Sequence, residues 1–222
     1  MSARLPAPGT ARRFVLEQTR LQPLALVPEI VVQLADEAVP LWQKTEEELA
    51  EHGVPLPYWA FAWAGGQAIA RYILDHADVV RGKRIVVFAG GGGIEAIAAV
   101  RTGAAQVLAS EIDPFARAAM ALNAEANGVE FAISDHDFLV EPLPEADVLC
   151  LGDVFFEQPM SERVAELALR AATAGVLVLV GDPGRTYLPR ERLIRLAEYA
   201  VPTPRTLEDA DVKQTVVWRF EA

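Results

Sequence analysis

Short apolar runs rich in β-branched residues alternate with Ala-rich segments from residue 84 onward. The runs are apolar at successive positions, which is typical of strands buried on both faces of a parallel sheet. The segments between them place apolar residues at helical spacing. The strand-like runs are 85–88, 106–110, 129–133, 146–151 and 175–180, and the helical segments include 94–100 and 114–127. This alternation predicts an α/β fold with a doubly wound, mostly parallel sheet.

The end of the chain departs from this alternation. A helix that begins with a proline is expected at 189–198, and residues 214–220 are strand-like. Pro202 and Pro204 would confine a strand near Tyr199 to a short edge piece, because proline cannot donate to a central ladder. Two closely spaced strands without a long helix between them indicate an antiparallel hairpin that completes the sheet.

The residues before the first strand-like run predict a different kind of structure. Residues 1–13 contain prolines and arginines but no acid, and we predict a disordered start there. Residues 14–32 are apolar and extended, as in a small strand pair or packing arm, and a helix is expected over 40–53. A further helix at 68–76 follows a turn at the double glycine. The predicted organisation is a disordered start at 1–13, an N-terminal helical and extended elaboration at 14–76, and a core at 77–222, with 14–222 forming one domain.

Consecutive glycines follow the first strand-like run. They are Gly90, Gly91, Gly92 and Gly93. Glycine has no Cβ, so the backbone can turn sharply there and approach a ligand closely. Glu111 ends the next strand about twenty residues further on, the spacing of an acid that binds ribose hydroxyls. A strand, glycine turn, helix, strand and acid in this order predict a nucleoside ligand at the carboxyl ends of the strands.

Two nucleoside ligands fit this unit. Gly91, Gly93 and Ala96 satisfy the dinucleotide pattern G-x-G-x-x-A, which would suit NAD. The same unit binds S-adenosylmethionine in methyltransferases. The antiparallel ending of the sheet favours a methyltransferase over a dehydrogenase, as an analogy of fold.

Two candidate contacts to such a nucleoside lie outside the glycine turn. Trp63 stands beside the double glycine at the start of a helix, where its ring could face an adenine or a substrate, or could simply pack in the core. In the loop after the third strand, Asp137 or Asp135 could accept a hydrogen bond from an adenine amino group. Either acid could equally be a solvated loop residue or a cap.

The candidate substrate-side residues follow the fourth strand. Asp153 lies there with the aromatic residues Phe155 and Phe156, on the edge where open α/β sheets bind ligands. The structural alternative is that Asp153 caps the helix that Pro159 begins.

Composition narrows the class of partner. The 222-residue chain has a formal net charge of -11, which disfavours nucleic acid and is compatible with a basic protein segment or a small molecule. No apolar run approaches the ~20 residues that cross a bilayer, so no membrane partner is predicted. The single cysteine, Cys150, suits a reducing compartment, and we expect a cytoplasmic protein. The histidines are not at metal-ligand spacing, so no metal site is predicted.

Several longer motifs together resemble one enzyme family. They are PYWAFAWAGGQAIARYILDH at 57–76, the glycine turn, EIDPFARAAMALNAEANGV at 111–129, GDVFFEQPM at 152–160 and GDPGRTYLPRERL at 181–193. In this order they resemble the electron-transfer-flavoprotein β-subunit lysine methyltransferases, a branch of the seven-strand S-adenosylmethionine-dependent enzymes. The resemblance extends over about 14–220, and it implies a Rossmann-like sheet of seven strands.

The resemblance also implies where the ligands bind. S-adenosylmethionine would lie in a pocket formed by Trp63, Gly90 to Gly93 and Glu111, and the substrate channel would pass Asp153 and Phe156. The family often has a tyrosine three residues after the aspartate, and Phe156 keeps its ring without the hydroxyl. The family pattern places an acid at the position of Val87 and a glycine at that of Ala89.

The predicted reaction is methyl transfer to a protein lysine. A lysine has a reference pKa of ~10.4 and must lose a proton before it attacks. Asp153 would orient the amine, and Phe155 or Phe156 would form an aromatic wall that favours a cationic nitrogen. The alternatives are a small-molecule N-methyltransferase and a non-catalytic binding protein that retains the fold. The sequence leaves the oligomeric state open.

Overall fold

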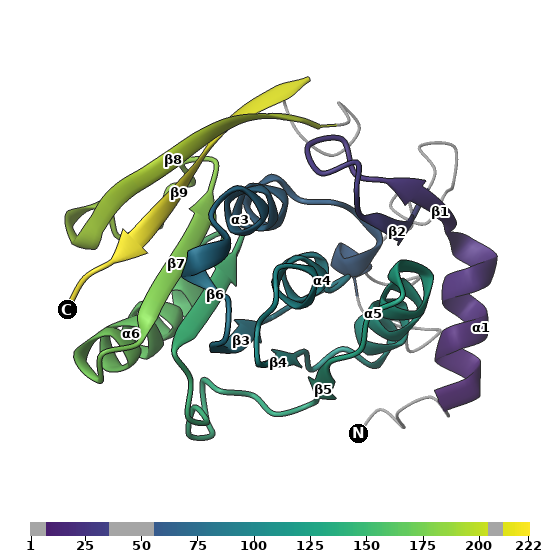
Figure 1. Ribbon diagram of the computed structural model, residues 1–222, viewed down its shortest axis with the longest axis horizontal. Helices are drawn as coiled ribbons and strands as arrows, with labels where there is room; N and C mark the ends of the chain where they lie inside the picture. The colour runs from purple at the N-terminus through teal and green to yellow at the C-terminus, as the bar shows by residue number, and fades with distance from the viewer. Residues whose placement is uncertain (1–7, 36–55, 204–210) are drawn as a thin grey trace.

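The described part of the chain forms a layered α/β structure. The computed structural model describes residues 8–35, 56–203 and 211–222. They form a seven-stranded sheet with helices on both faces (Figure 1), and a separate two-stranded sheet. The prediction of a doubly wound, mostly parallel sheet of seven strands is confirmed. The helix predicted over 40–53 lies outside the described residues.

The strand order of the large sheet places its ligand-binding edge. The order is β5-β4-β3-β6-β7-β9-β8. The strands are β3 Arg84–Phe88, β4 Gln106–Ser110, β5 Ala132–Ser134, β6 Val148–Gly152, β7 Leu177–Asp182, β8 Leu193–Pro202 and β9 Val212–Phe220. Strands β3 to β7 pair in parallel, whereas β9 is antiparallel to β7 and β8. The chain runs outward from β3 to β5 and then returns to β6 on the other side of β3. The order therefore reverses between β3 and β6, where open α/β sheets bind ligands.

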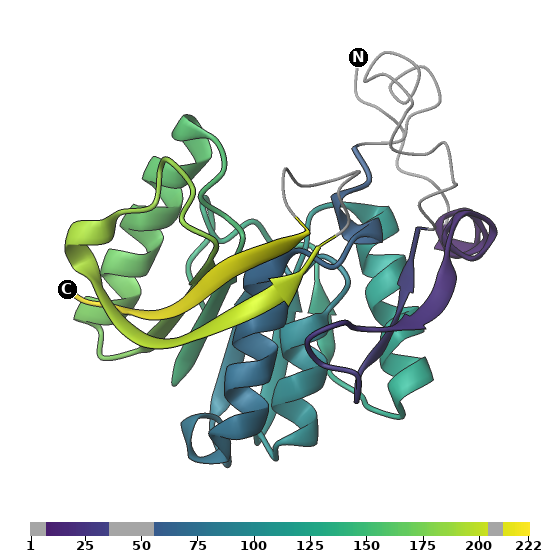
Figure 2. The same ribbon diagram turned by 90° about the horizontal axis from the view of Figure 1, so that it is seen from above.

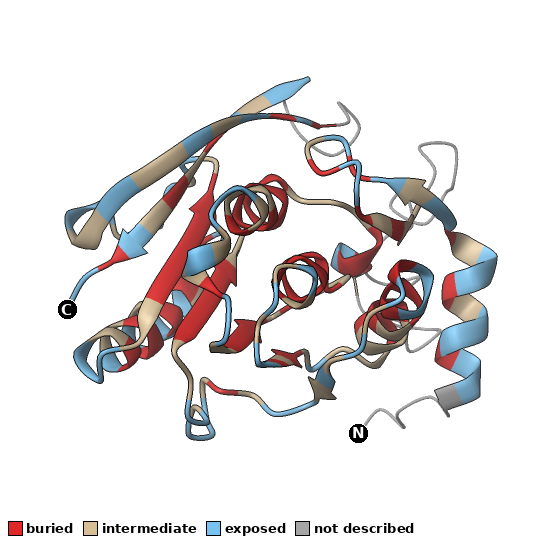
Figure 3. Ribbon diagram, viewed as in Figure 1, coloured by how far each residue is buried: buried red, intermediate tan, exposed pale blue. Residues whose placement is uncertain are grey.

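Different helices cover the two faces of the sheet. Helices α3 Ala64–Asp75, α4 Ile94–Arg101 and α5 Pro114–Asn127 lie on one face, and α6 Gln158–Thr173 lies on the other (Figure 1). Ile85 and Val87 of β3 belong to the core beneath α3 and α4, whereas Val86 and Phe88 belong to the core beneath α6. The central strands are buried (Figure 3). Because both faces are covered, these strands are apolar at successive positions.

The helix ends follow local signals in the sequence. Asp113 caps α5 by accepting the N–H of Phe115 at 2.8 Å, and Gly128 ends the helix with φ 65°. Gly93 precedes α4 with φ 79°. Both helices begin and end within one residue of the predicted bounds, because proline, aspartate and glycine stand where helix ends favour them.

The N-terminal residues pack on α5. Helix α1 Pro8–Gln18 includes residues 8–13, so the prediction of disorder is wrong for them; residues 1–7 lie outside the described chain. Ala11 and Val15 are buried, and the Phe14 and Phe115 rings meet edge to face at 5.0 Å. A helix this short is marginal alone, so its partner α5 stabilises it. Residues 14–18 also belong to α1, so the prediction of an extended segment is wrong for them. Beyond them, the predicted strand pair is confirmed as the antiparallel strands β1 Arg20–Pro23 and β2 Val31–Leu34.

The predicted helix at 189–198 is wrong. A 3-10 turn, η3 Arg190–Arg192, leads into the ten-residue strand β8 at the edge of the sheet (Figure 2). Strand β8 pairs with β9 from Leu193 to Pro202, so it is also longer than the short edge piece predicted near Tyr199. Pro202 is tolerated because it is the last residue of an edge strand. Pairing across the hairpin overrides a local pattern that could also form a helix.

Candidate active site

Four loops meet at the carboxyl edge of the sheet. They follow β3, β4, β6 and β7, and they carry the glycine turn, Glu111, Asp153 and Asp182. Carboxyl ends of parallel strands lie at one edge, so residues far apart in sequence come together there. The sequence-predicted sites on both sides of the strand-order reversal thus share one edge.

The glycine turn has two distinct parts. Gly91 has φ 49°, and an added Cβ would find only the Cα of Trp59, at 4.0 Å. Gly93 has φ 79°, and its added Cβ would lie 2.7 Å from Cγ of Met120 in α5. Cβ atoms at Gly90 and Gly92 would lie 3.1 Å from Met120 and 3.3 Å from Asn123. Close packing on α5 therefore requires three of these glycines, and Gly91 has the most open surroundings.

Ala89, just before the turn, has the left-handed φ of 50°. A side chain with a Cβ is strained in that conformation. The position therefore suits the glycine of the family pattern better than the alanine present. Val87 is fully buried, and its Cγ1 would lie 3.3 Å from a Cβ on Gly90.

Glu111 is held against the glycine turn. Its Oε2 accepts the N–H of Gly91 at 3.1 Å, and its Oε1 accepts the N–H of Asp113 at 3.0 Å. Burial raises its pKa, and the backbone donors oppose that shift. A carboxylate has about four acceptor positions, so Glu111 retains capacity for further donors. Glu111 thus lies beside the glycine turn, and its role toward ribose hydroxyls stays a prediction.

Trp63 and Asp137 make contacts within their own segments. Trp63 is the N-cap residue of α3, and its Nε1 donates to the carbonyl oxygen of Tyr58 at 2.7 Å. Asp137 follows β5, and its Oδ1 accepts the N–H of Leu139 at 2.9 Å. Both residues lie on loops next to the carboxyl edge, and their roles toward an adenine stay predictions.

The backbone of η1 Tyr58–Ala60 lies over the glycine turn, which the sequence did not indicate. The carbonyl oxygen of Trp59 would be 3.6 Å from a Cβ on Gly92. Trp59 itself is buried in the core between α1 and α5. The N-terminal elaboration thus forms one wall of the donor side.

Asp153 caps α3 rather than α6. Its Oδ2 accepts the N–H of Gly66 at 2.8 Å, and its Oδ1 accepts Nη1 of Arg185 at 2.6 Å. The N-cap of α6 is Glu157, so the structural alternative predicted for Asp153 is wrong. Asp153 has φ 57°, and burial raises its pKa to about 6 although Arg185 favours the charged form. A buried carboxylate with a perturbed pKa at a ligand edge is a candidate functional group.

Glycines bring α3 onto the sheet at this point. The double glycine lies in the first turn of α3, so the predicted turn before the helix is wrong. A Cβ on Gly65 would overlap the carbonyl oxygen of Gly181 in β7 and lie 2.7 Å from Oδ2 of Asp153. A Cβ on Gly152 would lie 3.0 Å from Cα of Gly66. The absence of side chains here allows the α3 N-terminus to reach Asp153.

Two buried acids near Asp153 were not predicted as site residues. Asp182 accepts the N–H groups of Gly184 and Arg185 through Oδ1, at 2.6 and 2.7 Å, and its Oδ2 has no hydrogen-bond partner. Glu95 lies in the first turn of α4, only 5% exposed, and burial raises its pKa to about 7. For Glu95, the sequence does contain a signal: it is the one acid in the Ala-rich helical segment after the glycine turn.

A group of partly exposed aromatic side chains includes Phe156, three residues after Asp153. Phe156 and Tyr58 are 42% and 44% exposed, and their ring centroids are 5.8 Å apart. Tyr58 is also 6.2 Å from Trp63, which is 6.3 Å from Phe61. Phe155 is buried in the core beneath α6. Of the two predicted aromatic residues, only Phe156 can therefore contact a substrate.

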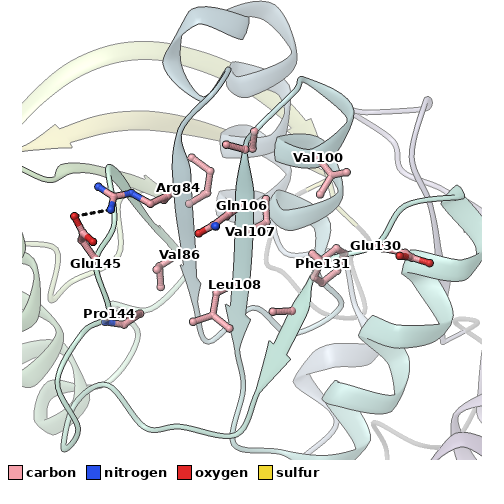
Figure 4. A pocket seen from close by; sticks show the side chains of 14 residues that line it. Arg84, Val86, Val100, Gln106, Val107, Leu108, Glu130, Phe131, Pro144 and Glu145 are labelled. Atoms are coloured by element: carbon pink, nitrogen blue, oxygen red, sulfur yellow. Dashed lines mark ion pairs between the residues drawn. The ribbon is translucent and has the colours of Figure 1, made fainter.

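One hollow lies at the opposite edge of the sheet from the predicted site residues. It has a volume of about 480 Å³ and lies at the amino ends of β3 and β4 (Figure 4). Its polar lining residues include Arg84, Gln106, Glu130 and Glu145, and none of the predicted site residues lines it.

In the described residues, no group of three His, Cys, Asp or Glu side chains is placed to hold a metal ion. No described helix is long and apolar enough to cross a membrane.

The site and the fold together define an enzyme class. The class is that of the class I methyltransferases of the seven-strand type. The features that define it are the reversed strand order, the glycine turn, the acid after β4 and the antiparallel β9.

A family model described as ribosomal protein L11 methyltransferase (PrmA) matches residues 69–150. The electron transfer flavoprotein beta subunit lysine methyltransferase of Rattus norvegicus is 35% identical over 88% of this chain and 78% of its own length. The Xenopus laevis protein of that name is 34% identical over 95% of this chain and 87% of its own length. The chain belongs to the electron transfer flavoprotein beta subunit lysine methyltransferase family.

Solved structures agree on the fold. A magnesium protoporphyrin IX methyltransferase from Synechocystis PCC 6803, with bound S-adenosylmethionine, matches with a TM-score of 0.51 at 11% identity, over 70% of this chain and 78% of that one. Family membership confirms the predicted enzyme class, a methyltransferase that uses S-adenosylmethionine, and decides against the dehydrogenase alternative.

Proposed function

We propose that this protein methylates lysine side chains of a protein substrate, with the electron transfer flavoprotein β subunit as the first candidate. The relatives that share most of its length carry that target in their names. The observation that carries the proposal is the largely buried carboxylate of Asp153, whose side chain is 11% exposed. It lies at the carboxyl edge, three residues before Phe156, whose exposed ring lies 5.8 Å from that of Tyr58. This arrangement suits a lysine side chain that passes the aromatic rings and places its amine beside the carboxylate of Asp153.

The donor side fits S-adenosylmethionine, which supplies an electrophilic methyl group when bound. Gly91 presents backbone with open space around it, and Glu111 is fixed beside it with acceptor capacity for ribose hydroxyls. Trp63 and Asp137 flank the adenine side. Two further carboxyl groups, those of Glu95 and Asp182, are buried at the same edge, and burial raises the pKa of each.

On the acceptor side, Asp153 orients the lysine amine. An incoming lysine has a pKa of about 10.4 and arrives protonated at neutral pH. Asp153, with a pKa of about 6, is ionised there and holds the nitrogen by a charge-assisted hydrogen bond. Phe156 provides an aromatic face beside the cation. Because Phe156 lacks the family's hydroxyl, hydrogen bonding to the nitrogen falls to Asp153.

Charge and composition support a basic protein partner and a cytoplasmic location. A net charge of -11 favours a basic, lysine-bearing segment over nucleic acid. The fully buried Cys150 is consistent with a reducing, cytoplasmic compartment.

The decisive experiment follows label from the donor into protein. The purified enzyme is incubated with isotopically labelled S-adenosylmethionine and the electron transfer flavoprotein β subunit, and separately with a cell lysate. Mass spectrometry then locates the label. Label on lysines of the β subunit supports the proposal, label confined to small molecules overturns it in favour of the small-molecule alternative, and no transfer at all favours a binding protein.

The Asp153→Asn variant tests the role of the carboxylate. Asparagine keeps an acceptor for the N–H of Gly66, so α3 stays capped, but the charge is lost. We expect turnover to fall about 100-fold or more, with donor affinity changed less than about threefold. The matched control is Asp147→Asn, which breaks an ion pair with Arg84 before the amino end of β6 and should leave turnover within about twofold. Equal losses of donor binding and turnover in Asp153→Asn would assign Asp153 to the donor site or the fold.

A further inference from the structure

Glu95 is a buried carboxylate that the proposed reaction does not yet use. It is the second residue of α4, directly after the glycine turn. Its carboxylate lies against the end of β6 and the first turn of α3, the same elements that Asp153 contacts. A Cβ added to Gly152 at the end of β6 would overlap its Oε1, and one added to Gly66 in α3 would lie 3.2 Å from the same oxygen. Two glycines therefore leave the space that this side chain occupies.

The surroundings of Glu95 are poor in positive charge. Among the described residues, no arginine, lysine or histidine forms an ion pair with it. Burial is the main reason that the pKa of Glu95 is raised, and the nearby charge of Asp153, just after β6, adds to the shift. Burial also raises the pKa of Cys150 on that strand, with a further contribution from Glu95. The first turn of α3, Ala64 to Gln67, contributes no charged side chain. Farther along the same edge, Arg185 is engaged with Asp153 and lies 3.7 Å from Asp182.

A buried acid without a cationic partner lowers the stability of the folded protein. Burying a carboxylate without a cation destabilises a protein by several kcal/mol unless the group takes up a proton. A protonated glutamate offers a neutral site, and an incoming cation would restore the charged form. The backbone position where the family pattern has an acid is occupied by the buried Val87, so that strand supplies no negative charge here.

We infer that Glu95 recognises the positive charge of the donor sulfonium, so that the enzyme binds S-adenosylmethionine in preference to the product, whose thioether sulfur carries no charge. The inference rests on the proposed donor and is independent of the acceptor. A carboxylate next to the glycine turn and beside Asp153 is placed to favour a cation at the boundary between them. The product lacks the sulfonium charge, so it gains nothing from an ionised Glu95 and is released more readily.

This role has a signature in pH. A cation favours ionised Glu95, so donor binding lowers the raised pKa and releases a proton. Affinity for S-adenosylmethionine should therefore rise about five- to tenfold between about pH 6 and pH 8, and affinity for S-adenosylhomocysteine should change much less. Asp153, with a pKa of about 6, titrates in the lower part of this range, so the same profiles are measured in Asp153→Asn.

Isothermal titration calorimetry with both compounds tests the inference. In the wild type, donor binding near neutral pH should release protons, seen as a dependence of the heat on buffer ionisation, and product binding should not. Glu95→Gln keeps the size of the side chain, and it should weaken donor binding about tenfold with product binding nearly unchanged. The control Glu130→Gln removes an exposed carboxylate and should change neither.

The outcomes separate this inference from the proposed function. Wild-type protein that binds neither compound would overturn both. If the wild-type protein binds both compounds with the same pH profile and releases no proton, the role of Glu95 alone is overturned. This result needs only the wild type, so it holds even if the Glu95→Gln variant fails to fold. An unchanged ratio of the two affinities in a folded Glu95→Gln variant would do the same.

Discussion

The two edges of the central sheet differ in how they treat charge. At the amino edge, Arg84 pairs with Asp147 at 2.8 Å and with Glu145 at 2.6 Å, in contact with solvent. At the carboxyl edge, Glu95, Glu111 and Asp153 are largely buried, and burial raises the pKa of each. A hollow of about 480 Å³ lies at the amino edge, and Arg84 and Glu145 are among the residues that line it (Figure 4). Carboxyl groups whose pKa is raised by burial cluster at functional sites, so they are a better guide to the candidate site than the position of a hollow.

Backbone conformation makes the same distinction. The described non-glycine residues with positive φ are Ala89 and Asp153, which follow β3 and β6. Glycines that would otherwise clash, such as Gly65 against Gly181, lie at this edge as well. Strain and close approach are typical of functional sites. The comparison of the two edges can therefore be tested by changing backbone space, charge and strain at the carboxyl edge.

The largest expected effect comes from filling the space between α3 and β7. Gly65→Ala would place a Cβ against the carbonyl oxygen of Gly181, which cannot move without breaking the pairing of β7. We expect a loss of about 3 kcal/mol in the free energy of unfolding. Urea denaturation followed by circular dichroism measures it. The matched control is Gly9→Ala in α1, where no atom lies within 4 Å of the added Cβ, and its change should stay within about 0.5 kcal/mol. A tolerated Gly65→Ala would show that α3 does not approach the sheet this closely.

The sequence predicted those parts of the site that depend on local spacing. The glycine turn and Glu111 belong to one strand-helix-strand unit, so their separation along the chain predicts their contact. The partners of Asp153 could not be predicted in this way, because Gly66 is 87 residues before it and Arg185 is 32 residues after it. Only the assembled sheet brings α3 and the loop after β7 to the same carboxylate.

The elements of the fold divide in the same way, into those that local sequence predicts and those that distant partners determine. The inner strands are apolar on both faces, and the pattern therefore located β3 and β4 well. Strand β8 lies at the edge with alternating exposure, and its pairing with β9 decides its structure. Helix α1 has only a weak local signal and depends on its contact with Phe115 of α5. Elements stabilised by distant partners are those that the sequence alone assigns wrongly.

The pH dependence of stability should differ in sign between the edges. Arg84 lowers the pKa of Asp147 to about 2, so Asp147 stabilises the protein above its unfolded pKa and loses this effect as pH falls toward 2. Burial raises the pKa of Glu95 to about 7 from an ordinary value of 4.5, so the native state holds its proton more tightly. The contribution of Glu95 is therefore most favourable at or below pH 4.5 and is lost as pH rises to 7.

Glu95→Gln isolates this effect, because glutamine does not titrate. Between about pH 5 and pH 7.5 the variant should gain roughly 2 kcal/mol in unfolding free energy relative to the wild type. Urea denaturation at both pH values measures the difference. Asp147→Asn, the control from the amino edge, should show no gain over this interval and a reduced loss in acid. A difference between wild type and Glu95→Gln that does not change with pH would mean that Glu95 titrates normally.

The smallest expected effect is a gain in stability from relieving strain at Ala89. The residue adopts φ 50° just before the glycine turn, and glycine reaches that conformation without steric cost. The greater freedom of glycine in the unfolded chain offsets part of the benefit, so Ala89→Gly should stabilise the protein by about 0.5 to 1 kcal/mol. Ala118→Gly, in the middle of α5, should instead destabilise it by about 1 kcal/mol. Opposite signs for the same substitution, measured by thermal unfolding, would confirm strain at the carboxyl edge. A loss of stability at both positions would mean that Ala89 relaxes to an ordinary conformation, and that the turn depends on its glycines alone.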